Sequence, residues 1–251
     1  MTEIVSEGIE LNRIYNEDCL EGMRRIPDKS VDMILCDLPY GTTRNKWDSI
    51  IPLEPLWAQY ERVIKDNGAI VLTAAQPFTS VLVSSNLRNF RYDITWDKSQ
   101  VTGFLNAKRM PLRKHEDVLV FYRKLPTYNP QFTQGQAYSI KRTHATSNYG
   151  EQSENETKSD GRRYPTSIIN IPQVREKGGH PTQKPVALFE YLIRTYTNEG
   201  EIVLDNCMGS GTTAVAAINT NRNFIGFEIE PEYVEIANKR INDALKAKGD
   251  E

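Results

Sequence analysis

Hydrophobic residues in the first 123 positions form two kinds of pattern, and these alternate along the chain. Apolar runs bounded by turn residues predict buried strands, and apolar residues three or four positions apart predict covering helices. Strands are expected at residues 9–15, 31–36, 69–73, 92–96 and 118–122. Helices are expected at residues 19–26, 53–65 and 78–87, the second being ended by Asn67-Gly68. This alternation indicates an α/β fold, with a mostly parallel sheet and helices on its faces.

The alternation stops near residue 124. Between residues 131 and 167 the only Leu, Ile or Val is Ile140, so this stretch cannot bury a core of its own. Its aromatic residues are interleaved with the basic pairs Lys141-Arg142 and Arg162-Arg163. Rings beside guanidinium groups suit contacts with bases and phosphates.

Strand and helix signals resume near Pro185, which suits the first position of a helix. The expected elements are a helix at 185–196, a strand at 202–204, a helix at 212–219, a strand at 223–227 and a last helix from Pro231. We therefore divide the chain into three parts. These are residues 1–123, an insert of residues 124–177, and residues 178–251.

Composition narrows the class of protein. A length of 251 residues with 39% hydrophobic and 25% charged residues fits a large α/β domain. The sequence has neither an apolar run of membrane-helix length nor a signal-peptide pattern. Its three cysteines and three histidines are scattered, without a metal-type pairing. We expect a cytoplasmic protein with reduced thiols, no metal and no membrane partner.

The formal net charge of −2 is distributed unevenly. Residues 98–177 hold 14 Lys/Arg against 7 Asp/Glu, whereas the remaining residues hold 17 against 26. A basic block in an acidic protein is expected where one face meets phosphates, although a solvated charged loop has the same composition. The candidate phosphate contacts, which would be DNA contacts if the partner is DNA, are Lys108, Arg109, Arg113, Lys141, Arg142, Arg162 and Arg163.

The predicted strand 31–36 leads directly into Asp37-Leu38-Pro39-Tyr40. A carboxylate, a proline-stiffened turn and an aromatic ring thus lie at the carboxyl end of a strand, where open α/β sheets bind ligands. An acceptor beside a stacking ring suits a flat heterocycle that carries an exocyclic amine. Taken alone, the four residues are equally consistent with an ordinary turn after a strand.

A second ligand site is predicted after the strand 202–204. Gly209-Ser210-Gly211 lies between this strand and a helix, and Glu228 ends the following strand. Glycines let the backbone approach a nucleoside cofactor, and a carboxylate at the next strand end can bind both ribose hydroxyls. The residues Gly209-x-Gly211-x-x-Ala214 also fit the NAD fingerprint. S-adenosylmethionine is favoured because it is cationic and lacks a phosphate, and four acidic side chains are predicted at strand ends. They are Asp18, Asp37, Asp205 and Glu228.

Together these residues resemble the amino-methylating DNA methyltransferases. Asp37-Leu38-Pro39-Tyr40 resembles the Asp-Pro-Pro-Tyr catalytic motif of that family, and residues 205–213 resemble its Asp-Pro-Phe-x-Gly-Ser-Gly-Thr-Thr cofactor loop. Residues 180–185 resemble the segment before that loop, and residues 225–233 its ribose-binding strand end. The catalytic motif comes first, which is the order of the β group, a circular permutation of the Rossmann-like methyltransferase sheet. The resemblance covers residues 10–243 and is to bacterial and phage enzymes. It implies a catalytic part in residues 1–123, a target-recognition insert in residues 124–177 and a cofactor-binding part in residues 178–251.

The resemblance implies a site-specific enzyme that methylates N6 of adenine in double-stranded DNA after flipping the base. Asp37 and the Leu38 carbonyl would accept the amine hydrogens, Pro39 would shape the turn and Tyr40 would stack on the base. N4 of cytosine is the alternative target. Other readings are a catalytically inactive DNA-binding subunit, an RNA or protein methyltransferase, and an NAD oxidoreductase. The resemblance also suggests a homodimer.

The resemblance further implies which residues hold S-adenosylmethionine. Thr182 and Lys184 would meet its methionine carboxylate, and Asp18-Cys19 its adenine edge. Asn206-Cys207 stands where the family has Pro-Phe, so an aromatic contact is lost and weaker binding is expected. The full predicted set is Asp18, Cys19, Asp37, Thr182, Lys184, Asp205, Cys207, Gly209, Ser210, Gly211, Thr212 and Glu228.

Overall fold

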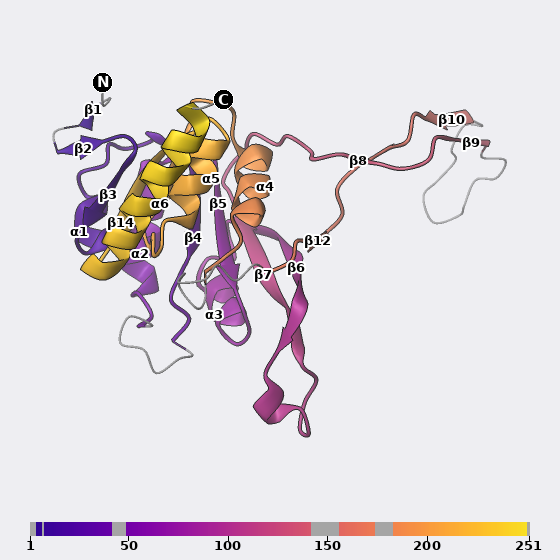
Figure 1. Ribbon diagram of the computed structural model, residues 1–251, viewed down its shortest axis with the longest axis horizontal. Helices are drawn as coiled ribbons and strands as arrows, with labels where there is room; N and C mark the ends of the chain where they lie inside the picture. Colours follow the sequence, from indigo (N-terminus) through magenta and orange to yellow (C-terminus); the bar gives the residue numbers. More distant parts are fainter. Residues whose placement is uncertain (1–3, 7, 42–48, 142–155, 174–182, 250–251) are drawn as a thin grey trace. The chain divides into compact units, whose positions relative to one another are not determined.

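The computed structural model describes residues 4–6, 8–41, 49–141, 156–173 and 183–249. The chain forms two compact units (Figure 1). The larger unit contains Met1–Asn129 and Ser167–Glu251, and the smaller unit is Pro130–Thr166. Among the described residues, no helix is long and apolar enough to cross a bilayer.

An eight-stranded sheet forms the centre of the larger unit (Figure 1). In spatial order its strands are β12 (Ile168–Asn170), β6 (Phe90–Thr102), β7 (Arg113–Phe121), β5 (Ile64–Ala74), β4 (Val31–Asp37), β13 (Ile202–Asp205), β14 (Asn223–Glu228) and β3 (Arg13–Asn16). Strand β7 is antiparallel to both of its neighbours, and every other neighbouring pair is parallel. The predicted α/β fold with a mostly parallel sheet is confirmed.

Helices cover both faces of this sheet. One face carries α1 (Cys19–Met23), α2 (Leu53–Val63) and α3 (Phe78–Ser85), and the other carries α4 (Val186–Tyr196), α5 (Thr212–Asn219) and α6 (Pro231–Gly249). Side chains of β4 alternate between the two cores, since Ile34 and Cys36 pack with the first set and Met33 and Leu35 with the second. A strand buried on both faces needs an unbroken apolar run, which is the pattern seen at residues 33–36.

Strands β4 and β13 lie side by side although they come from opposite ends of the chain. Val203 pairs with Met33, and Leu204 with Ile34. From β4 the chain passes through α2 to β5 on one side, whereas from β13 it passes through α5 to β14 on the other. The connections therefore diverge between these two strands, and a crevice forms at the carboxyl ends of strands where such a reversal occurs.

The structure corrects the predicted end of α2. Asn67-Gly68 was expected to terminate this helix, but α2 ends at Val63 and the dipeptide lies inside β5. Ile64 already has an extended backbone and pairs with Val31 of β4. A side chain at Gly68 would begin 2.7 Å from the Asp32 carbonyl oxygen, so the glycine allows close approach of two strands.

Other elements differ from the predictions in their extent. The predicted strand 9–15 is divided by a turn at Asn12, which has a φ of 61°, into β2 (Ile9–Glu10) and β3. Strands β6 and β7 continue beyond their apolar runs into a long hairpin. Strand β12 pairs with β6, so residues from the end of the predicted insert belong to the main sheet. The smaller unit, Pro130–Thr166, therefore contains fewer residues than the predicted insert of residues 124–177.

The smaller unit contains two short antiparallel strand pairs. These are β8 (Thr133–Gln134) with β11 (Arg162–Arg163) and β9 (Tyr138–Lys141) with β10 (Glu156–Ser159). The rings of Phe132 and Tyr164 lie 4.8 Å apart, and the Arg163 guanidinium lies 4.7 Å from the centre of the Tyr138 ring. Ring and cation–π contacts thus contribute to a segment whose sequence offers few aliphatic residues.

Candidate active site

A cavity of about 830 Å³ lies at the carboxyl ends of β4, β13 and β14. Its volume is typical of a pocket for a small molecule or cofactor. Each of these strands ends in an acidic residue, and the cavity brings together most of the residues predicted from the sequence. The predicted residues that line it are Asp18, Cys19, Asp37, Leu38, Pro39, Tyr40, Lys184, Asp205, Cys207, Gly209, Ser210, Thr212 and Glu228.

Gly211 was predicted to contact the cofactor, but it is absent from the cavity lining. It caps α5 with a φ of +83°, and a side chain there would begin 2.8 Å from the Ala237 Cβ. The glycine therefore serves the turn and the packing of α5 on α6, and its predicted contact with the cofactor stays a prediction. Thr182 lies outside the described residues, so its predicted contact stays a prediction.

The predicted DNA contacts fall into two groups. In the larger unit, Lys108 and Arg109 are exposed beyond β6, and Arg113 lines the cavity. In the smaller unit, Arg162 forms an ion pair with Asp160 at 2.9 Å, and Arg163 contacts the Tyr138 ring. Outside the described part of the chain lie Arg142 and the side chain of Lys141.

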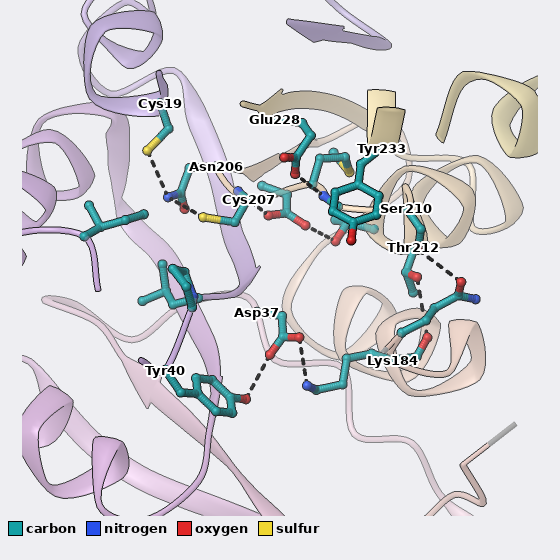
Figure 2. Close-up of a pocket in the computed structure, with 18 of the residues that line it drawn as sticks. Cys19, Asp37, Tyr40, Lys184, Asn206, Cys207, Ser210, Thr212, Glu228 and Tyr233 are labelled. Carbon is teal, nitrogen blue, oxygen red and sulfur yellow. Dashed lines mark hydrogen bonds and ion pairs between the residues drawn. The ribbon is translucent and has the colours of Figure 1, made fainter. Parts of the chain in front are cut away.

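The loop after β13 is held by two buried carboxylates (Figure 2). Glu228 accepts hydrogen bonds from the backbone amides of Gly209, at 2.7 Å, and Glu230, at 2.9 Å. Asp205 accepts from the Cys207 amide at 3.0 Å and from the Thr213 hydroxyl. The same acidic groups that face the cavity therefore also fix the shape of the glycine loop.

These carboxylates are costly to ionise. Burial raises the pKa of Asp205 to about 6, against the hydrogen bonds from Thr213 and Cys207 that lower it. Burial also raises the pKa of Glu228. Within the described residues, neither carboxylate forms an ion pair with a basic side chain. A cation in the cavity would stabilise the charged forms of both carboxylates, so Asp205 and Glu228 fit a positively charged nucleoside.

Asn206-Cys207, where the sequence departs from the family pattern, is built into a polar cluster. The Asn206 side-chain amide lies 3.5 Å from the Cys19 sulfur and 3.4 Å from the Cys207 sulfur, and its carbonyl accepts from the Tyr60 hydroxyl (Figure 2). Asn206 is buried, so these partners satisfy it. Tyr60 lies on α2. No local pattern links it to a loop so distant in sequence.

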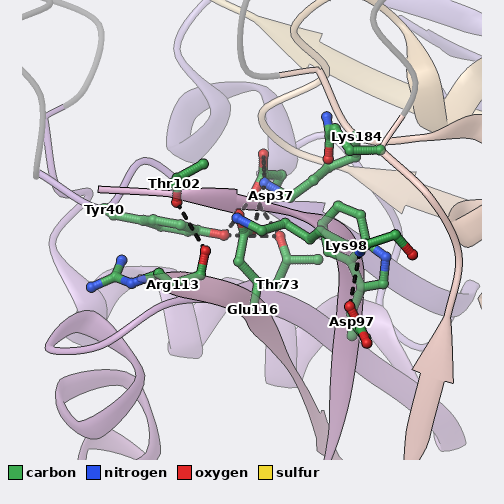
Figure 3. Close-up of polar contacts among 12 residues, drawn as sticks. Asp37, Tyr40, Thr73, Asp97, Lys98, Thr102, Arg113, Glu116 and Lys184 are labelled. Atoms are coloured by element: carbon green, nitrogen blue, oxygen red, sulfur yellow. Dashed lines mark hydrogen bonds and ion pairs between the residues drawn. The ribbon is translucent and has the colours of Figure 1, made fainter. Parts of the chain in front are cut away.

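Asp37 lies at the end of β4 with most of its acceptor capacity in use (Figure 3). One carboxylate oxygen accepts from the Tyr40 hydroxyl at 2.8 Å and from the Thr73 hydroxyl, and the other accepts from the Lys184 ammonium at 2.8 Å. A carboxylate offers about four lone-pair positions, so roughly one remains on the oxygen that faces Lys184. Asp37 is thus oriented by the protein and can still accept a further hydrogen.

Lys184 belongs to a buried chain of charges that the sequence did not reveal. Its ammonium lies 3.2 Å from Glu116, whose other oxygen lies 3.0 Å from the ammonium of Lys98. The two lysine side chains are each 8% exposed and that of Glu116 is 16% exposed. Lys98 and Glu116 meet only because β6 pairs with β7, which places Trp96 opposite Glu116.

The charges in this chain stabilise one another. Burial alone would lower the pKa of Lys184, but Asp37, Tyr40 and Glu116 together raise it well above its usual value. Burial would likewise raise the pKa of Glu116, yet the two lysines hold it below the ordinary value. Lys184 therefore remains an ammonium and Glu116 a carboxylate at neutral pH. Lys184 therefore holds the position of Asp37, and Glu116 holds that of Lys184.

The Tyr40 ring is held from two directions. It stacks on Phe78, with centroids 5.4 Å apart and an interplanar angle of 25°, and its hydroxyl donates to Asp37. The Lys184 ammonium also lies 5.5 Å from the ring centroid. Burial raises the pKa of Tyr40, and Asp37 adds to this effect, so its hydroxyl remains a donor.

The fold and the cavity define an α/β enzyme with a nucleoside-cofactor loop beside a carboxylate and an aromatic ring. Comparison with known proteins identifies the family: a model described as DNA methylase, covering N6 and N4 methyltransferases, matches residues 31–239. The chain therefore belongs to the DNA methylase family and is a DNA methyltransferase. The resemblance inferred from the sequence is confirmed at this level.

Relatives and solved structures agree with this assignment. The chain is 29% identical to DNA adenine methyltransferase YhdJ of Escherichia coli K12, covering 94% of this chain and 85% of that protein. It is also 29% identical to the type II methyltransferase M1.MboII of Moraxella bovis, covering 93% and 98%. The solved M1.HpyAVI–SAM complex is similar with a TM-score of 0.64 and 28% identity, covering 91% and 98%.

Proposed function

We propose that this protein transfers the methyl group of S-adenosylmethionine to N6 of adenine in double-stranded DNA. One observation carries the proposal: Asp37 and Tyr40 share a single cavity with the glycine loop and Glu228. An amine acceptor and a nucleoside site must be this close for direct transfer between their ligands. From the family resemblance we also propose that the reaction takes place in the cytoplasm of a bacterial or phage-infected cell.

The cavity suits S-adenosylmethionine in its chemistry. Asp205 and Glu228 favour a cationic ligand, and Glu228 stands where the ribose hydroxyls of a nucleoside are bound in related folds. Asp18, Cys19, Ser210 and the other predicted lining residues complete the proposed binding set. When bound, the cofactor supplies an electrophilic methyl group. The 28% identical M1.HpyAVI, solved as a SAM complex, supports this choice.

The residues of the catalytic half prepare the amine. The remaining acceptor position of Asp37 and the Leu38 carbonyl would take the two hydrogens of the flipped base, and Tyr40 would hold its ring. Accepting both hydrogens draws the nitrogen toward tetrahedral geometry and exposes its lone pair. Most of the catalysis is then positioning and electrostatics, with Lys184 holding Asp37. A contact of Lys184 with the cofactor carboxylate remains part of the proposal.

Adenine is the proposed base because a relative that aligns over most of both chains is named an adenine methyltransferase. Asp37 could accept hydrogens from cytosine N4 equally well, so the residues of the cavity do not distinguish the two amines. The family model also covers both reactions. N4-cytosine methylation is therefore the second candidate.

Modification sequencing of DNA from a methylation-deficient host expressing the protein should reveal N6-methyladenine at one recurring sequence. The matched control is the same host expressing the Asp37→Ala variant, which should leave the genome unmodified. N4-methylcytosine at a recurring sequence would instead assign the second candidate. Unmodified DNA, from protein that binds S-adenosylmethionine, would favour an inactive DNA-binding subunit.

We assign target recognition to residues 124–177, with the smaller unit as its centre. Support comes from the exposed side chains of Arg162 and of the aromatic residues Phe132, Tyr138 and Tyr164, which suit phosphates and bases. Phosphate contacts are proposed for the basic residues predicted from the sequence.

Assembly as a homodimer is proposed from the family resemblance, and sedimentation would measure it.

Cofactor affinity should fall as the pH is lowered from 7.5 to 5.5. The pKa of Asp205 is raised to about 6, so its charge is largely lost across this interval, and Glu228 shifts in the same direction. Loss of the Asp205 charge alone should weaken binding about fourfold at pH 5.5, because a group with a pKa of about 6 is then roughly three-quarters protonated. Calorimetric titration measures it. The control ligand is S-adenosylhomocysteine, which lacks the positive sulfonium and should show a smaller change. Equal pH dependence for both ligands would contradict the proposed electrostatic role.

A further inference from the structure

The hairpin formed by β6 and β7 exposes large apolar side chains at its tip. The two strands continue beyond the sheet, pairing as far as Thr102 and Arg113, and a short helix, η1 (Phe104–Asn106), follows β6. Figure 1 shows this hairpin projecting away from the helices of the larger unit. Leu105 is fully exposed, Phe104 is 68% exposed and Met110 is 57% exposed. Grouped exposed side chains of this size usually mark an interaction site.

The tip has a defined backbone structure. Gly103 has a φ of +91°, which turns the chain into η1. The amides of Asn106 and Ala107 then donate to the carbonyls of Gly103, at 2.9 Å, and Phe104, at 3.1 Å. The Met110 amide donates to the Asn106 carbonyl at 3.0 Å. Local hydrogen bonds therefore present the apolar side chains outward on a folded turn.

Basic residues accompany these apolar side chains. Lys108 and Arg109 are exposed between Leu105 and Met110. The same two strands reach back to the active site, where Thr102 and Arg113 line the cavity beside Lys98 and Glu116 (Figure 3). A polyanion that delivers a base to Asp37 would thus continue from the cavity along the hairpin toward its tip.

We propose that this tip docks on duplex DNA, inserting Leu105 and Phe104 into the base stack beside the flipped adenine while Lys108 and Arg109 contact phosphates. The inference rests on the proposed function, because only duplex DNA requires a base to be extruded. Apolar wedges that separate base steps are a known means of deforming DNA. Such a wedge would occupy space left by the extruded base and slow its return.

The charges favour DNA over a second copy of the chain. In a symmetric contact between two copies, the same patch meets itself, so Lys108 and Arg109 would approach their counterparts. Like charges in an interface oppose association, whereas phosphates attract both residues. Duplex DNA is therefore the partner that suits both the apolar and the basic side chains of the tip.

The test compares Leu105→Ala with Leu87→Ala on matched and premelted substrates. Leu87 is 66% exposed and precedes Phe90, so it lies near the other end of β6 and is a control for loss of an exposed leucine. The substrates are a duplex with the identified sequence and the same duplex with a mismatch at the target base. Leu105→Ala should slow methylation of the matched duplex about tenfold and recover most of that loss on the mismatch. Leu87→Ala should match the unsubstituted protein on both.

Several results would overturn the wedge. One is an unchanged methylation rate for Leu105→Ala on the matched duplex, and another is an equal loss of its rate on both substrates. A third is a change in the sedimentation of Leu105→Ala with unaltered DNA affinity, which would indicate a contact between copies. If the unsubstituted protein methylates neither substrate while binding S-adenosylmethionine, the proposed function itself fails. The two failures are therefore separable in one set of measurements.

Discussion

Replacing Asp37 with alanine should reduce methyl transfer about a thousandfold, an effect comparable to removing a polar group that stabilises a transition state. The side chain occupies the end of β4, and its carboxylate is oriented by Tyr40, Thr73 and Lys184. Alanine removes the acceptor for one amine hydrogen, so the nitrogen lone pair is no longer directed outward. Single-turnover methylation of duplex DNA measures the effect.

The same variant should still fold and bind S-adenosylmethionine. Without Asp37 the Lys184 ammonium keeps Glu116 as a partner at 3.2 Å, so no buried cation is left unpaired. The carboxylates that hold the glycine loop, Asp205 and Glu228, are unchanged. Calorimetric binding of the cofactor is the control. Substantial methylation by Asp37→Ala would show that another group accepts the amine hydrogen.

Replacing Lys184 with methionine should lower the free energy of unfolding by about 3 kcal/mol, because breaking the buried ion pairs leaves Asp37 without a counter-charge and Glu116 with Lys98 alone. The Lys184 side chain is 8% exposed and contacts both Asp37 and Glu116. Methionine has a similar length and keeps the packing. Methylation should also slow, because Asp37 loses one of the groups that orient it. Urea unfolding and single-turnover kinetics measure the two effects.

Lys124→Met is the matched control for charge removal at a surface pair. Lys124 lies 3.0 Å from Asp66, and the two side chains are 71% and 52% exposed, so its loss should lower the free energy of unfolding by no more than about 1 kcal/mol. Equal losses for the two variants would contradict a special role for the buried chain of charges. A stable Lys184→Met protein with unaltered methylation would remove Lys184 from the site.

The deficit of Lys184→Met should also depend on pH. In the folded protein the pKa of Glu116 is lowered, so its stabilising ion pairs are present above its unfolded pKa and are lost as the pH falls through the folded value. The difference between the two proteins should therefore be largest near neutral pH and shrink in acid. This follows because a protonated Glu116 no longer attracts Lys184.

Local sequence predicted the parts of the site that lie on single segments. The helix at residues 212–219 agrees with α5, and the ends of β13 and β14 place Asp205 and Glu228 at the cavity as expected. The end of α2 was not predicted correctly from its turn residues. Asn67-Gly68 has the composition of a helix end, but the chain already pairs with β4 at Ile64. Strand pairing, which is not a local property, overrode the signal.

The sequence by itself determined the order of strands and helices, the acidic strand ends and the catalytic and cofactor motifs, because each depends on periodicity or spacing within a short segment. Only the tertiary structure decided which side chains meet across strands. It placed Lys98 and Glu116 beside Lys184 and Tyr60 beside Asn206, and it assigned Gly211 to packing. Those contacts join residues far apart along the chain, and their energies depend on burial and on pairing that no single segment encodes.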